Sequence, residues 1–236
     1  MAMIDIPTID HQGSFTGYRA EPASAPRGAI VVIQEIFGIN PGIRATCDHW
    51  ASLGYLAVAP DLFWRLEPGV VLDPDVPEEF QQALALMNRF DQDQGIADIE
   101  AAIRAARERL PEGGRVGAVG YCLGGRLAFM TAARTDVDAS DGYYGVGLEG
   151  LLGEKHAIAR PLMLHIAGAD HFVTPDKQKL IHEGLDGEPR VTLHDYPGED
   201  HGFAVAMGNR RSEHAAQLAD RRTEAFFGEH VARVQV

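Results

Sequence analysis

A cysteine stands between glycines at a point where a strand is predicted to turn into a helix. The segment GYCLGG, residues 120–125, follows the apolar run 116–119, which is typical of a short buried strand. Gly120 and Gly124 flank Cys122, because side chains two residues before or after a nucleophile on so sharp a turn would collide. A helix beginning there would favour a thiolate and a developing oxyanion. The pattern indicates a nucleophilic cysteine, with a buried structural thiol as the alternative.

Asp170 and His201 follow Cys122 in the order nucleophile, acid, histidine. Asp170 comes after the predicted buried strand 161–167, and His201 lies on the loop after the predicted strand 190–196. An α/β-hydrolase arranges its triad in this order along the chain. In such a triad His201 would act as the base or acid. Asp170 would hold the imidazole ring of His201 in one tautomer.

Glu35 is a fourth candidate for chemistry, directly after the apolar run 29–33. In an α/β-hydrolase this loop supplies the second oxyanion-hole N–H group. A carboxylate beside Cys122 could accept the thiol proton, which matters because only a few per cent of free cysteine is thiolate at neutral pH. The alternative is a solvated loop glutamate.

The elements that must position these residues alternate along the chain. Apolar runs predict strands at 29–33, 55–59, 116–121, 139–144, 161–167 and, at an edge, 190–196. Helices are predicted at 41–53, 78–90, 95–110, 124–134, 175–184 and 212–227, and a loop at 64–77. Alternation of this kind predicts an α/β fold with a mostly parallel central sheet and helices on both faces. We expect one domain over residues 1–236.

Composition excludes several kinds of partner. The 236 residues include 34 acidic and 21 basic ones, a net charge of −13, which argues against a nucleic-acid or anionic-membrane surface. No apolar stretch is long enough for a membrane span, and the N-terminus does not resemble a secretory signal. With only two cysteines, we expect a reducing, cytoplasmic setting.

We expect no cofactor and no metal. A zinc site is conceivable, but neither H-E-x-x-H nor C-x-x-C spacing supports it. Its ligands would be His165, Asp170, His171 and His201.

Six stretches resemble the dienelactone hydrolase (carboxymethylenebutenolidase) family: QEIFGIN at 34–40, PDLF at 60–63, GYCLGG at 120–125, GYYGVGLE at 142–149, GADHFV at 168–173 and DHGF at 200–203. The resemblance implies an α/β-hydrolase fold and a cysteine hydrolase whose triad is Cys122, Asp170 and His201. It also implies that Glu35 holds the resting thiol and generates the thiolate once substrate is bound. The remaining implied site residues are Ile36 and Leu123, whose N–H groups would form the oxyanion hole, and Tyr144, which would line the pocket.

The chain departs from the family pattern where dienelactone-cleaving members bind the substrate carboxylate with two arginines. Phe80 and Val205 stand in their places, and Leu84 and Met87 replace a tyrosine and a tryptophan. These four side chains predict an apolar wall, unsuited to an unpaired carboxylate. Phe37 and Phe172 are also expected to bind substrate. The alternative is that Phe80 and its neighbours are ordinary core residues. Candidate substitutes for the arginines are Arg65 and Arg126, the latter expected on a helix surface.

We therefore expect a monomer that hydrolyses an ester or lactone bond in a neutral, apolar small molecule. One alternative is a true carboxymethylenebutenolidase acting on dienelactone. Two others are a catalytically silent binding protein on the same scaffold and a redox-active thiol at Cys122. The intact set of four candidate residues argues against a silent protein, and the lack of a nearby C-x-x-C partner argues against a redox thiol.

Overall fold

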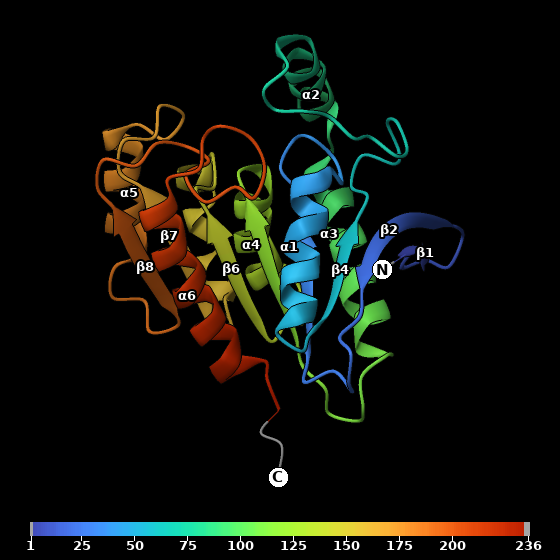
Figure 1. Ribbon diagram of the computed structural model, residues 1–236. Coiled ribbons are helices and arrows are strands. Elements are labelled where there is room, and N and C mark those ends of the chain that lie inside the picture. Colours follow the sequence, from blue (N-terminus) through green and yellow to red (C-terminus); the bar gives the residue numbers. More distant parts are fainter. Residues whose placement is uncertain (1, 234–236) are drawn as a thin grey trace.

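An eight-stranded sheet forms the centre of the protein (Figure 1), as described by a computed structural model for residues 2–233. Its spatial order is β1-β2-β4-β3-β5-β6-β7-β8. In this spatial order, each strand from β4 to β8, with β3 among them, pairs in parallel with its neighbour. The β1–β2 and β2–β4 pairs are antiparallel. The strands are β1 (Ala2–Pro7), β2 (Ser14–Ala20), β3 (Ala29–Ile33), β4 (Leu56–Pro60), β5 (Val116–Tyr121), β6 (Ala139–Tyr143), β7 (Leu162–Ala167) and β8 (Val191–Tyr196).

Helices cover both faces of this sheet. On one face lie α1 (Pro41–Ser52) and α6 (Glu213–His230), and on the other lie α3 (Gln92–Arg107), α4 (Leu123–Arg134) and α5 (Pro175–Leu185) (Figure 1). In β3 the side chains of Ile30 and Val32 join the core beneath α1 and α6, whereas Val31 and Ile33 join the core beneath α3 and α4. This two-sided burial explains why β3 is apolar at every position. The predicted α/β fold is confirmed.

Local signals fix where several helices begin. Asn40 caps α1 by accepting a hydrogen bond from the Ile43 N–H, and Pro41 occupies the first helical position. Asp91 caps α3 in the same way, accepting from two backbone N–H groups. Because α1 begins directly after the loop that carries Glu35, its cap also fixes the path of that loop.

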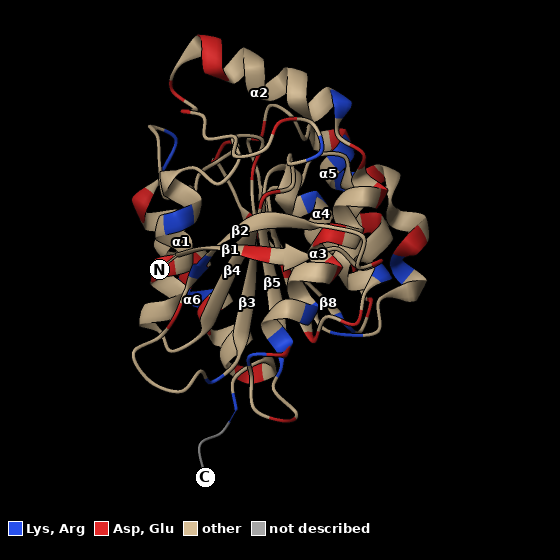
Figure 2. Cartoon of the chain, turned by 90° about the vertical axis from the view of Figure 1, so that its right-hand side faces the viewer, with Lys and Arg blue, Asp and Glu red and all other residues tan. Residues whose placement is uncertain are grey.

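The helix α2 (Pro77–Arg89) lies beyond the carboxyl edge of the sheet and stands apart from the other helices (Figure 1). Its charged residues lie mainly at its two ends, acidic at the start and basic at the end, with a long uncharged stretch between them (Figure 2). Phe80, Leu84 and Met87 lie in that stretch and are half-buried. Together with the preceding loop, α2 therefore presents an apolar surface to the strand ends.

The structure adds elements that the apolar pattern does not reveal. The strands β1 and β2 form an N-terminal hairpin at one edge of the sheet, and most of β1 is exposed, so its residues carry no buried run. Two short 3-10 helices, η1 (Leu148–Gly150) and η2 (Leu152–Ala157), follow β6. No helix within residues 2–233 combines the length and the apolar composition needed to cross a membrane.

Candidate active site

Cys122 occupies a strained turn between β5 and α4. Its backbone has φ 57° and ψ −113°, a conformation that side chains rarely adopt. The flanking glycines are required sterically: a Cβ on Gly120 would lie 2.0 Å from the Gly124 carbonyl oxygen, and one on Gly124 would lie 2.5 Å from the Ile33 carbonyl oxygen. Such a turn leaves the thiol at the amino end of α4, only partly buried. The predicted tight junction with an accessible side chain is therefore present.

Asp170 and His201 meet at the carboxyl ends of β7 and β8. The Nδ1 atom of His201 lies 2.8 Å from the Asp170 carboxylate, and both side chains are about 1% exposed. The other Asp170 oxygen accepts hydrogen bonds from the N–H groups of Phe172 and Val173, at 2.8 and 3.2 Å. Because the carboxylate can only accept, the Nδ1 atom carries a proton, and Nε2 is the acceptor whenever the ring is neutral.

The environment of His201 favours its charged form. Burial lowers the pKa of His201, but the hydrogen bond to Asp170 and the nearby Cys122 sulfur more than offset burial and raise it to about 10. The Nε2 atom is buried and makes no hydrogen bond of ordinary geometry with the described residues. Hydrogen bonds at catalytic sites are often long or poorly aligned before substrate binds.

Glu35 is buried and lies next to an arginine that the sequence did not single out. Its Oε1 atom is 3.5 Å from Nη2 of Arg210, and the Arg210 guanidinium also lies over the Phe37 ring. Burial raises the pKa of Glu35, and the charges of Arg210 and His201 partly oppose that rise. The net rise means that Glu35 binds a proton more readily than an exposed glutamate does, and Arg210 lies close enough to pair with its carboxylate form.

A pocket of about 240 Å³ opens beside the sulfur of Cys122. Seven predicted site residues besides Cys122 and His201 line it: Ile36, Phe37, Phe80, Leu84, Met87, Leu123 and Phe172. Leu123 is the first residue of α4, where a backbone N–H has no partner within the helix. The pocket thus combines a mainly apolar wall with a nucleophile, a histidine and a free N–H group.

Two further predicted residues lie outside this lining. Tyr144 is buried behind the site with φ 38°, and its ring packs against His201 with centroids 5.0 Å apart. Val205 lies against a separate, smaller cavity that Glu35 also lines. Val205 was predicted to contact substrate, but it is not part of the pocket wall, because the loop after His201 turns its side chain inward.

The arginines differ from the prediction. Arg65 pairs with Asp98 and stays away from the pocket, so it is no substitute for the family's arginines. The prediction that Arg126 lies on the helix surface is wrong: Arg126 lines the pocket, because it lies four residues after Cys122 and shares its side of α4. Arg210 also lines the pocket. It was missed because it lies in an irregular loop that no periodic pattern marks.

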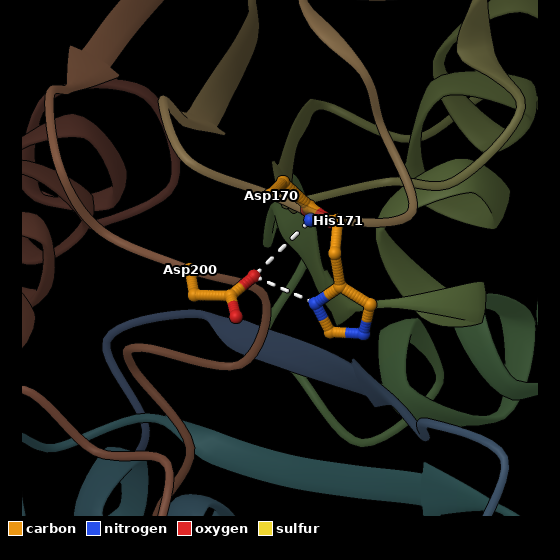
Figure 3. Close-up of side chains that lie close together, drawn as sticks. All are labelled: Asp170, His171 and Asp200. Carbon is orange, nitrogen blue, oxygen red and sulfur yellow. Dashed lines mark hydrogen bonds and ion pairs between the residues drawn. The ribbon is translucent and has the colours of Figure 1, made fainter.

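The zinc site considered from the sequence does not form as a group. His165 lies in a buried network with Asp141, Thr223 and Tyr196. Asp170, His171 and Asp200 do lie close together (Figure 3), but Asp200 pairs with the His171 ring at 2.8 Å and Asp170 is engaged by His201. Asp200 also accepts a hydrogen bond from the His201 backbone N–H. Through this bond and its contact with His171, Asp200 joins the loop after β7 to the loop after β8. These contacts account for the cluster without an ion.

The strand order and the sharp turn after β5 define the α/β-hydrolase class. A crystal structure of a Klebsiella pneumoniae protein, provisionally named a dienelactone hydrolase, is similar over 98% of this chain and 100% of that one, with a TM-score of 0.81 and 26% identity. The chain belongs to the dienelactone hydrolase family, whose model matches residues 15–231.

Relatives of known sequence support the same family. A protein of Azospirillum brasilense, provisionally named a carboxymethylenebutenolidase, is 48% identical over 233 residues, covering 98% of this chain and 100% of its own length. A Pseudomonas putida protein named carboxymethylenebutenolidase is 43% identical over 214 residues, covering 91% of each chain. The predicted family resemblance is confirmed, and the chain is a dienelactone hydrolase-like hydrolase.

Proposed function

We propose that this chain hydrolyses an ester or lactone bond through a thioester on Cys122, and that its substrate is neutral and largely apolar. The observation that carries the proposal is the position of Cys122, in left-handed backbone beside a mainly apolar pocket that His201 also lines. A strained nucleophile next to a buried histidine–carboxylate pair is the arrangement that acyl transfer needs.

In the first half-reaction the Cys122 thiolate attacks the carbonyl carbon and the carbonyl electron pair moves to oxygen. The N–H groups of Leu123 and Ile36 would stabilise this oxyanion. When it collapses, the ester C–O bond breaks, and the imidazolium of His201 protonates the departing alkoxide. In the second half-reaction His201 takes a proton from water, which attacks the thioester, and the C–S bond breaks.

The thiolate itself would come from proton transfer to Glu35. Burial favours the protonated form of Glu35, whereas the 3.5 Å ion pair with Arg210 favours the carboxylate. The ion pair with Arg210 supports a carboxylate at this position, and the net rise in the pKa of Glu35 supports the uptake of a proton from Cys122. Asp170 would keep the Nδ1 atom of His201 protonated throughout, so that Nε2 gives its proton in the first half-reaction and takes one in the second.

The neutral, apolar substrate is supported by the wall of the pocket. Phe80, Leu84 and Met87 from α2 face the pocket, together with Phe37 from the loop after β3. A carboxylate placed against these side chains would lose its hydration without gaining a partner.

A second candidate function is carboxymethylenebutenolidase activity on dienelactone itself. The specific observation in its favour is that Arg126 and Arg210 both line the pocket. The Nε atom of Arg126 is buried without a hydrogen-bond partner among the described residues, so this side chain could receive an anion. The names of the relatives at 43% and 48% identity point the same way.

One experiment separates these candidates: a neutral phenyl ester and carboxylated dienelactone are offered to the purified protein. A Cys122→Ala variant identifies the nucleophile, and Cys47→Ala serves as the control, because Cys47 is the other free cysteine and is buried in α1. Cleavage of the ester alone, lost only in Cys122→Ala, supports the main proposal. Efficient dienelactone cleavage supports the second candidate, and full activity of Cys122→Ala would refute both.

A further inference from the structure

Glu35 lines a small cavity behind the substrate pocket. This cavity has a volume of about 10 Å³, and Asn40 and Tyr121 are also among its lining residues. Glu35 is not among the residues that line the substrate pocket. A volume of roughly 10–15 Å³ holds one water molecule when polar groups are available to bind it.

Two polar atoms at this cavity lack protein partners. The Oε1 atom of Glu35 is buried without a hydrogen bond, since its contact with Arg210 at 3.5 Å is an ion pair of poor hydrogen-bond geometry. Tyr121 is only 8% exposed; its hydroxyl group has no hydrogen-bond partner within residues 2–233 and, unlike the Glu35 oxygen, is not fully buried. Buried polar atoms are normally satisfied by protein or by ordered water. One water molecule between these two atoms would satisfy both.

Tyr121 also lines a larger cavity on the far side. This cavity has a volume of about 320 Å³ and lies between α1 and α6. Charged side chains at its rim, including His49, Asp220 and Glu224, are about one-third to one-half exposed, so the cavity reaches solvent. Tyr121, Thr46 and Ala206 line both the small cavity at Glu35 and this larger cavity on the face of the sheet covered by α1 and α6.

We infer that a water molecule bridges Glu35 and Tyr121, and that Tyr121 relays protons along an outlet from Glu35 to the α1–α6 cavity. This inference rests on the proposed function, in which Glu35 takes the Cys122 proton. Burial raises the pKa of Tyr121 well above its usual range, with the charges of Asp220 and Asp141 adding to the rise, so the hydroxyl keeps its proton between transfers.

Each proton given up in this transfer has a named acceptor. Protonated Glu35 gives its proton to the bridging water, the water gives one of its own to the Tyr121 oxygen, and Tyr121 gives its hydroxyl proton to water in the larger cavity. After deacylation, the product acid returns a proton to the Cys122 sulfur and leaves as a carboxylate. The sum is ester plus water yielding carboxylate, alcohol and one proton, and the outlet carries that proton while substrate fills the pocket.

The timing of proton release tests the outlet. A phenyl ester is mixed with enzyme in weak buffer containing a pH indicator. The conditions are chosen so that deacylation is slower than acylation. The phenol that acylation releases stays protonated near pH 7, so it does not itself change the indicator. In the wild-type protein, one proton per active site should appear together with the phenol burst: the phenol takes its proton from His201, the Cys122 proton leaves through Glu35, and His201 stays neutral until deacylation because the thioester no longer carries the Cys122 charge that raises its pKa. In Tyr121→Phe the phenol burst should persist while proton release slows by about tenfold or more and follows deacylation.

Tyr143→Phe is the matched control. Its ring stacks near Tyr121 with centroids 4.8 Å apart, but its hydroxyl is hydrogen-bonded to Thr223 and it does not line the small cavity. This variant should release its proton with the phenol. A proton burst of wild-type rate in Tyr121→Phe, or an equal loss of both bursts, would overturn the outlet. A phenol burst that survives Cys122→Ala would instead refute the proposed function.

Discussion

The buried hydrogen bond between Asp170 and His201 allows a direct test of the proposed triad by the substitution Asp170→Asn. Asparagine has nearly the same shape, and its carbonyl oxygen can still accept the N–H groups of Phe172 and Val173. The fold should therefore persist. The amide, however, carries no charge and can direct a donor toward the Nδ1 proton of His201, where the carboxylate lies 2.8 Å away.

The expected loss follows from the protonation of His201. Its pKa is about 10 against an ordinary value of 6.5, although burial alone would lower it, and the bond to Asp170 is the strongest influence that raises it. Breaking a buried ion pair by removing one partner costs about 3–5 kcal/mol, here in the stability of the imidazolium. We therefore expect kcat/KM at pH 7 to fall by about a thousandfold.

The pH profile gives an independent readout. In the wild-type protein the imidazolium persists until the pH approaches 10, so activity that depends on it should be lost only in that range. In Asp170→Asn the loss should begin near or below neutrality. The assay is kcat/KM for a neutral phenyl ester between pH 5 and 10, with urea unfolding to check the fold.

Asp200→Asn is the control, since this carboxylate is nearby but about 59% exposed and pairs with the His171 ring (Figure 3), and the asparagine oxygen can still accept the His201 backbone N–H. It should keep activity within a few-fold of the wild-type value. An Asp170→Asn variant with activity within about threefold of wild type and an unshifted profile would refute the reasoning about the triad.

Three further predictions concern the turn, the core and the pocket. Gly120→Ala should destabilise the protein by about 3 kcal/mol or more in urea unfolding, because the new Cβ would meet a carbonyl oxygen at 2.0 Å, whereas Gly150→Ala, with open space around it, should change little. Thr223→Val should cost about 1–3 kcal/mol in the same assay, because the buried Asp141 carboxylate loses a hydrogen bond of 2.6 Å. Phe80→Arg should raise kcat/KM for dienelactone relative to the neutral ester by about tenfold or more, and an unchanged ratio would count against the role of the apolar wall.

The strand ends could be predicted because their signals are local. Cys122, Asp170 and His201 each follow an apolar run, and parallel strands bring such ends to one edge of a sheet. The same reasoning found Glu35 after β3. The N-terminal hairpin was not predicted, because an exposed edge strand such as β1 has little buried surface and so leaves no apolar run.

The arginines of the pocket could not be placed from sequence, for two different reasons. Arg126 was assigned to the helix surface, although its spacing of four from Cys122 already put both side chains on one side of α4. Arg210 depends on the path of an irregular loop: the N–H of Ser212 bonds back to the carbonyl of Phe203, which turns the intervening residues over Glu35. No local pattern specifies such a return.

Arg210 links the choice of substrate to the activation of the thiol. It lies against Glu35 and also lines the pocket, so it cannot fully serve two carboxylates at once. With a neutral substrate Arg210 stays with Glu35, and the burial of Glu35 must supply its affinity for the Cys122 proton. With an anionic substrate Arg210 would turn toward the ligand, and the buried Glu35 would lose its partner and bind a proton more readily. The two candidate functions therefore differ in what activates the thiol as well as in what fills the pocket.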